Sequence, residues 1–360
     1  MNYARVITGL LIVITAIAVG AVLKLTVNIM LPLVIALLLS FVLSPLVEWL
    51  VRMRVPRILA IILVILLFLG FGFLLGLVLY SSVHSMIRIW PSYQRRFLNI
   101  MDTTIKSLNI SAPLVDRFNL SRSLSSIAVT FFGNFIGFLA GLIMVLVYLL
   151  FILLEKPFLR KKLHDAIQGP RTEKVYKILG HINKQVGRYL TIKFIVSLVT
   201  GLLVWGAFAL IGLDFAFIWG VLAFLFNFVP SIGSIAVGVV SLVFAVVQFY
   251  PDWNPVIAVG LSMLAIQNVI GNFTEPKLQG DNLNLSPVII LFSLLLWGWL
   301  WGVMGMFLSV PLTVALKIIL EHIPGLEFAG VLMGTGNYRA RIRQTKEETE
   351  PNGTQENINR

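Results

Sequence analysis

Charged and helix-breaking residues gather in one short stretch of the chain, FTEPKLQGDNLNLSPVII, at Phe273–Ile290. Glu275 and Lys277 flank Pro276, and long apolar runs lie on both sides of the stretch. A carboxylate in such surroundings can bind a proton or pair with a cation. Two interpretations of Glu275 stay open: a charge pair with Lys277 that only caps the helix, or a titratable group that sets the helix angle.

A stripe of amide side chains leads into this stretch. Asn268, Asn272 and Glu275 follow one another at i, i+4 and i+7, which predicts one face of a helix. Gln267 and Gly271 lie next to that face. Because polar side chains facing lipid are costly, the stripe should face protein or a water-filled path, where it could bind a polar solute.

Other kinds of chemistry have little support in the sequence. The histidines, His84, His164, His181 and His322, show no metal-ligand spacing, and the chain has no cysteine. It also has no nucleophile elbow and no phosphate-binding loop. We therefore expect no enzyme activity, no metal site and no cofactor. The formal charge of +12 does not predict nucleic-acid binding, because the basic residues lie in connecting segments and the tail.

The elements that must position these residues are membrane helices. Apolar residues make up 58% of the 360 residues and charged residues 12%, whereas soluble domains have roughly 45–50% and 25%. A spanning helix needs about 20 apolar residues, so the chain is predicted to be an all-α polytopic membrane protein with about eight membrane elements. The continuous elements are expected at 6–23, 28–47, 58–80, 126–154, 190–212 and 254–273.

Two further apolar regions, 214–249 and 287–321, are interrupted by helix breakers. In membranes, broken helices concentrate where they line a pathway, and paired breaks often form the binding site of a transporter. The alternative is two kinked helices without a ligand. The two breaks contain Asn227, Pro230, Gly233, Gly298 and Gly302, and Pro311 follows the second break.

Charge predicts the orientation. The 155–193 segment holds ten Lys/Arg against three acids, so we expect it and both termini to be cytoplasmic. The external 81–125 segment, with six Lys/Arg against two acids, goes against this rule but is less basic. The predicted division is helices at 1–80, an external amphipathic segment at 81–125, a helix at 126–154, a basic cytoplasmic helical segment at 155–189, a core with broken helices at 190–321 and a mostly disordered cytoplasmic tail at 322–360.

Gly133, Gly137 and Gly141 recur at every fourth residue of the predicted 126–154 helix. Glycine lets helix backbones approach closely in lipid, so this spacing predicts a helix-packing face, within one subunit or between subunits.

The stretches NFTEPKLQGDNLNLSP (272–287) and LLLWGWLWGVMGMFLSVPLTVALK (294–317) resemble the C-terminal signature of the autoinducer-2 exporter family of bacterial membrane proteins. Upstream, FNFVPSIGS is similar to the family's Asn-x-x-Pro-x-x-Gly break. Asp281 departs from the family, which often has a basic residue there. The pattern falls on Asn227, Pro230, Gly233, Asn272, Glu275, Pro276, Gly280, Pro287, Trp297, Gly298, Gly302, Gly305 and Pro311.

The resemblance implies a transporter that assembles as a homo-oligomer, a pentamer, in the bacterial inner membrane. Some members export the quorum-sensing signal autoinducer-2, and others look like sodium/proton antiporters. The stretches LLLWGWLWG and NFVPSIGS favour the branch of quorum-sensing signal transport proteins. The partners then expected are a small solute, the lipid bilayer, and protons or sodium as the coupling ion. A non-transporting membrane scaffold is a third alternative.

The chemistry of the solute fits the exporting branch. Autoinducer-2 is a small polyhydroxylated molecule, so it needs amide and backbone partners of the kind that Asn227, Gln267, Asn268 and Asn272 could supply. A sodium site usually includes a buried carboxylate. The four acidic residues between positions 213 and 286 all lie near predicted helix ends, namely Asp214, Asp252, Glu275 and Asp281.

The same stretch suggests how the path opens. The prolines and Gly280 are expected to end the helix and free a link, Gly280–Ser286, before the next apolar region. Our hypothesis is that this link lets the 287–321 element rock against the 214–249 element.

Overall fold

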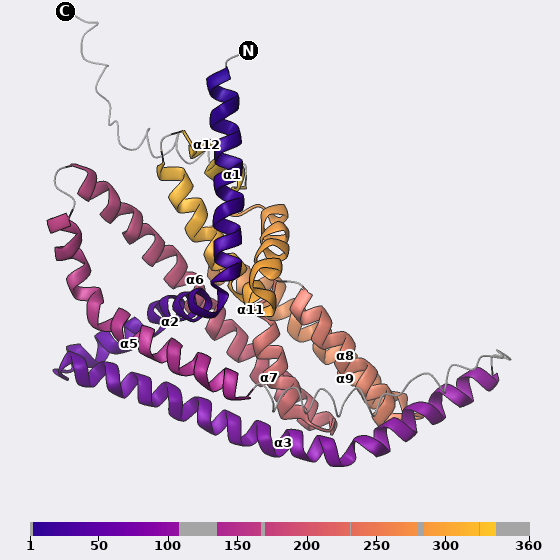
Figure 1. The fold of residues 1–360 in the computed structure, drawn as a ribbon. Coiled ribbons are helices and arrows are strands. Elements are labelled where there is room, and N and C mark those ends of the chain that lie inside the picture. Colours follow the sequence, from indigo (N-terminus) through magenta and orange to yellow (C-terminus); the bar gives the residue numbers. More distant parts are fainter. Residues whose placement is uncertain are drawn as a thin grey trace, which may run out of the picture. The chain divides into compact units, whose positions relative to one another are not determined.

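The computed structural model describes residues 3–107, 135–166, 170–230, 232–279, 284–323 and 325–335, and every regular element in these ranges is helical (Figure 1). Seven helices of the described ranges are long and apolar enough to cross a membrane, which confirms the all-α polytopic prediction. The elements are α1 (Tyr3–Leu25), α2 (Val27–Arg52), α3 (Arg57–Ser107), α5 (Phe135–Ala166), α6 (Pro170–Ile211), α7 (Ala216–Phe226), α8 (Ile232–Phe249), α9 (Trp253–Ile266), the π-helix η2 (Gln267–Thr274), α10 (Glu275–Gln279), α11 (Pro287–His322) and α12 (Glu327–Leu332).

The chain divides into two compact units. The first contains Met1–Lys161 and Leu190–Leu278, and the second contains Lys162–Tyr189 and Gln279–Arg360. The division within the C-terminal half therefore falls at the end of α10, beside the predicted link.

An apolar core of the first unit lies where α2, α3 and α5 meet. Val47, Ile61 and Leu149 lie in it and are almost fully buried. The outer faces of the same helices keep large apolar side chains exposed, such as Leu66 and Leu67. A helix that is apolar all round is typical of a membrane span, because lipid covers the faces that protein does not.

A second core of this unit packs α6 against α7, α8 and α9, with Phe208 and Val259 at its centre. Here α7 and α8 form a helical hairpin: the ring centroids of Trp219, near the start of α7, and Phe244, near the end of α8, lie 5.5 Å apart. At 11 residues, α7 is only about 16 Å long, too short to cross a ~30 Å hydrocarbon core. The broken 214–249 region is therefore a hairpin rather than one kinked span. Helix α9 packs antiparallel beside α8 (Figure 1).

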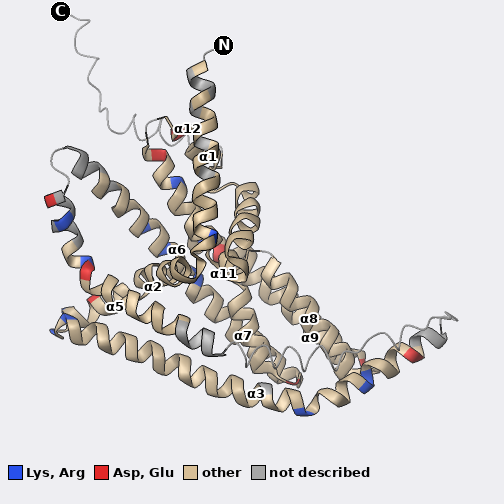
Figure 2. Ribbon diagram, in the orientation of Figure 1, with Lys and Arg blue, Asp and Glu red and all other residues tan. Residues whose placement is uncertain are grey.

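Helices run across three of the predicted segment boundaries, at 80/81, 154/155 and 189/190. Helix α3 runs on through residues 81–107 without interruption, and α5 and α6 continue into the basic 155–189 segment. The polar ends contain strong helix formers such as Leu, Lys and Arg, which favour continuation of the helix. Many of the charged residues lie on these polar extensions (Figure 2). Residues 108–134, which include the rest of the predicted external segment, lie outside the described ranges.

The extension of α3 belongs to the first unit through contacts with the α6–α7 turn and with the end of α8. The Tyr93 hydroxyl donates to the Asp214 carboxylate, and Arg96 donates to the Gln248 carbonyl over 3.0 Å. Gln248 in turn bonds the Gly212 carbonyl. These contacts hold the extension against the α6–α7 turn and the end of α8.

In the second unit, α11 also folds back on itself (Figure 1). Trp301 and Gly302 leave helical geometry, Gly302 with φ +65°. The Trp297 indole N–H then donates to the Thr313 hydroxyl over 3.1 Å, although 16 positions separate the two residues. In a straight helix that separation would be about 24 Å. The broken 287–321 region is thus a second hairpin, followed by α12.

Candidate functional site

The tip of the first hairpin is built by Asn227, Pro230 and Gly233. Asn227 caps the end of α7 and is 7% exposed. A Cβ at Gly233 would overlap the backbone carbonyl of Phe226. Only glycine therefore allows α8 to start so close to the end of α7. Pro230 is half-buried in the turn and accepts a backbone hydrogen bond from Ile232.

Helix α6 faces this tip with a buried polar stripe. Lys193, Ser197 and Thr200 are 3%, 0% and 3% exposed, and their spacing puts them on one helix face. The Asn227 amide donates to the Ser197 hydroxyl over 3.0 Å. One turn further on, a Cβ at Gly201 would lie 2.8 Å from the Gly220 carbonyl, so α6 and α7 touch backbone to backbone.

Glu275, the first residue of α10, pairs with Lys193 of this polar stripe. Its carboxylate oxygen lies 2.5 Å from the Lys193 ammonium, and the two side chains are 17% and 3% exposed. Lys277, which the sequence suggested as a partner, is exposed. Lys193, Ser197, Asn227 and Glu275 together form what we call the buried polar cluster.

The predicted amide stripe lies on the π-helix η2 rather than on a regular α-helix. The Asn272 amide donates to the Asn268 side-chain oxygen over 2.9 Å, so these two residues do share a face. Both are exposed in the single chain. The Thr274 hydroxyl bonds the Val269 carbonyl five residues back, a contact that suits π-helical rather than α-helical winding. Gln267 is half-buried, with its side chain over Gly271.

The remaining predicted residues lie outside the buried polar cluster. Pro276 is exposed on α10, and Gly280 lies outside the described residues. Pro287 is the first residue of α11. Gly298 contacts Met306 across the second hairpin, Gly302 forms its turn, and Pro311 is buried in its second leg.

The predicted packing face of 126–154 has one glycine with described surroundings, Gly141, and no side chain or backbone of the described residues lies against it. A Cβ at Gly141 would have no atom within 4 Å. Gly137 lies on α5, but its surroundings lie outside the described side chains, and Gly133 lies outside the described residues. Gly141 therefore packs no helix within the described part of this chain, and contact between subunits stays a prediction.

A family model described as AI-2E family transporter matches residues 10–325. The chain belongs to this family. It is therefore a membrane transporter, and its family and relatives indicate transport rather than enzyme activity.

Three relatives carry names that differ in the activity they state. A Borreliella burgdorferi protein, provisionally named as a transport protein, is 35% identical over 92% of this chain and 91% of its own length. The AI-2 transport protein TqsA of Escherichia coli is 32% identical over 88% of this chain and 92% of its own. The sodium-lithium/proton antiporter of Halobacillus andaensis is 26% identical over 79% and 87%.

In this AI-2E family member, sequence reasoning missed Lys193. We assigned it to the basic cytoplasmic segment, although it also falls inside the predicted 190–212 membrane helix. An ionisable residue within a membrane helix is by default a candidate functional residue with a partner. That signal could have identified Lys193. Ser197, by contrast, carries no such signal, because serine is common in membrane helices.

Asn227→Ala is expected to destabilise the transporter. It leaves the fully buried Ser197 hydroxyl without the amide that now donates to it, at a cost of about 1–3 kcal/mol. Thermal unfolding in detergent measures the change, with Asn254→Ala at an exposed position of α9 as the control. Equal unfolding temperatures for the two variants would contradict a structural role for the Asn227–Ser197 bond.

Proposed function

We propose that this AI-2E transporter exports a small, neutral, polar solute, and that autoinducer-2 is the solute. The observation that carries the proposal is the 2.5 Å pair between Lys193 and Glu275. The carboxylate is already neutralised by a buried ammonium, which would repel a sodium ion at the same place. The amide and hydroxyl groups of Asn227, Ser197 and Thr200 suit a hydroxylated solute instead.

The name of one relative supports this choice of solute. TqsA, named as an AI-2 transport protein, matches over most of both chains at 32% identity. The exposed amides Asn268 and Asn272 offer further hydrogen-bonding groups for a solute, on the helix that ends at Glu275.

The proposed driving step is protonation of Glu275. A neutral carboxyl no longer holds the Lys193 ammonium, so the end of α9–α10 is released from α6. Ser197, one turn along α6, bonds the tip of the first hairpin, so a shift of α6 reaches that tip. The unit boundary at Leu278/Gln279 supports a hinge at the end of α10, beside the Gly280–Ser286 link in which the sequence predicts it. We place the protein in the bacterial inner membrane, with both termini on the cytoplasmic side. We further propose that it assembles as a homo-oligomer, a pentamer.

A sodium(lithium)/proton antiporter is the second candidate, favoured by the 26% identical antiporter of Halobacillus andaensis. In that case Glu275 would exchange its lysine partner for a cation during the cycle. The third candidate, a non-transporting scaffold, would use the surface helices for docking and have no use for the buried polar cluster.

Transport in vesicles separates the three candidates. Purified protein is reconstituted, a pH gradient is imposed and then collapsed, and movement of autoinducer-2 is measured. A second arm adds sodium and reads internal pH. Glu275→Gln, which mimics the protonated group, is compared with Asp252→Asn, the same change at an exposed helix cap at the other end of α9.

We expect gradient-dependent movement of autoinducer-2 in wild type and Asp252→Asn, and about a tenfold or greater loss in Glu275→Gln, the effect of removing one charge-assisted bond. A sodium-driven pH change without movement of autoinducer-2 would replace the proposal with the antiporter. Neither signal in wild type would leave the scaffold.

A further inference from the structure

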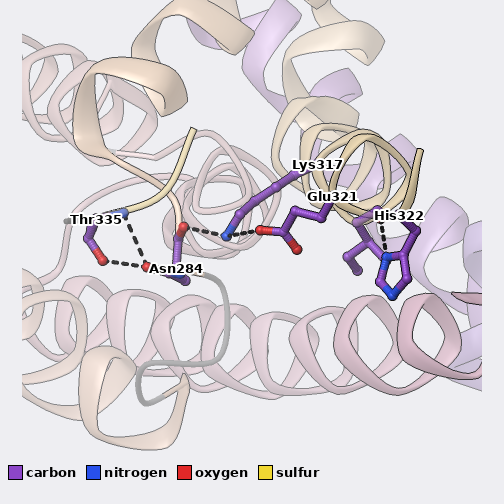
Figure 3. A network of polar contacts seen from close by, with 6 residues as sticks. Asn284, Lys317, Glu321, His322 and Thr335 are labelled. Carbon is purple, nitrogen blue, oxygen red and sulfur yellow. Dashed lines mark hydrogen bonds and ion pairs between the residues drawn. The ribbon is translucent and has the colours of Figure 1, made fainter. Parts of the chain in front are cut away.

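The base of the second hairpin is tied together by residues from three places in the chain. Figure 3 shows Asn284, just before α11, in contact with Lys317 on the second leg of α11 and with Thr335 beyond α12. All of these residues belong to the second unit.

Lys317 makes the first tie. Its side chain is buried, and its ammonium donates to the Asn284 backbone carbonyl over 2.7 Å. Glu321, one turn further along α11, lies 3.6 Å away and balances the charge. A buried ammonium must be paired, because leaving a charge unpaired in an apolar surrounding is costly. The carbonyl of Asn284 is therefore bound to the second leg by a strong, charge-assisted bond.

The chain that follows α12 makes the second tie. The Thr335 backbone N–H and hydroxyl both donate to the Asn284 side-chain oxygen, over 3.1 and 2.6 Å. Beside it, the Ser286 N–H donates to the Met333 carbonyl over 2.9 Å. Asn284 has φ +41°, a left-handed conformation that asparagine tolerates better than most residues. Asparagine thus supplies both the backbone shape and the acceptor.

We propose that Asn284, Lys317 and Met333–Thr335 form a clasp that keeps the base of the α11 hairpin closed throughout transport. The tip of the hairpin is already closed, because a Cβ at Gly305 would overlap the Trp297 carbonyl. With base and tip both held, the two legs move as one body. The residues of the clasp are positioning residues: they act through the hairpin and have no contact with the solute in this mechanism.

Two experiments test the clasp. The sequence has no cysteine, so Ser286→Cys with Met333→Cys can be crosslinked without background. Transport of autoinducer-2, and of sodium against protons, is then measured with the clasp locked shut. Separately, hydrogen exchange at Ser286–Ile290 is measured in Lys317→Met and in the milder Thr335→Val, which removes only an exposed hydroxyl. Lys317→Arg tests rescue, and Lys277→Met is the control at an exposed lysine of α10.

We expect the crosslinked protein to transport at the wild-type rate, because the clasp never opens. Exchange at Ser286–Ile290 should rise at least about tenfold in Lys317→Met, less in Thr335→Val, and not in Lys277→Met. Lys317→Met should lower the maximal transport rate with an unchanged KM, and Lys317→Arg should recover part of it.

Loss of transport on crosslinking would overturn the proposal, because the base would then have to open. Exchange that is unchanged in both Lys317→Met and Thr335→Val would overturn it as well. Failure of the proposed solute is a separate result: wild type would then move no autoinducer-2, while the exchange experiment would still decide whether the clasp exists.

Discussion

Gly233→Ala and Gly305→Ala are each expected to abolish transport and to lower the yield of folded protein sharply. A Cβ at Gly233 would overlap the Phe226 carbonyl, and one at Gly305 would overlap the Trp297 carbonyl. In both places the obstacle is backbone, which cannot rotate away as a side chain does. The cost should therefore exceed the about 1–3 kcal/mol typical of overpacking, since the tip of a hairpin must open.

Gly206→Ala and Gly72→Ala are the matched controls. Both glycines lie in apolar helices of the first unit, and a Cβ at either position would have no atom within 4 Å. Alanine also favours a helix over glycine, by about 1 kcal/mol in soluble hosts. Thermal unfolding in detergent and vesicle transport are compared across the four variants. If Gly233→Ala and Gly305→Ala unfold at the control temperature, the tight hairpin tips are not features of the folded protein.

Lys193→Met is expected to have the second large effect. Methionine fills much of the same space but leaves the Glu275 carboxylate, only 17% exposed, without its ammonium partner. Removing one member of a buried ion pair typically costs about 3–5 kcal/mol, because the remaining charge stays desolvated. The variant should unfold at a clearly lower temperature and lose transport.

The double variant Lys193→Met/Glu275→Gln distinguishes a lost charge balance from lost packing. Glutamine is neutral, so the double variant buries no unpaired charge and should recover much of the stability that Lys193→Met loses. Its transport should stay low, because no group remains to bind the coupling proton. Additive losses of stability in the double variant would show that the two side chains do not interact. Recovered transport would show that the pair has only a structural role.

Several parts of the site could be predicted from local patterns. The breaks at 214–249 and 287–321 are visible because proline and glycine interrupt runs that are otherwise apolar, and both became hairpins. Their folding back was not visible, because it depends on Gly233 and Gly305 lying against carbonyls of the opposite leg. The π-helix was also missed, since helix periodicity assumes regular winding and the stripe at Asn268 and Asn272 fits either form.

Composition and local pattern were enough to predict the class of the protein: all-α, membrane-spanning, with two interrupted regions in the C-terminal half. These properties depend on the transfer of apolar residues into lipid, which local composition measures directly. The partners of the polar residues, in contrast, depend on the tertiary fold. Lys193 and Glu275 are 82 positions apart, and Asn284 and Thr335 are 51 apart. Such pairs depend on how the helices between them fold back and pack, and no local pattern contains that information.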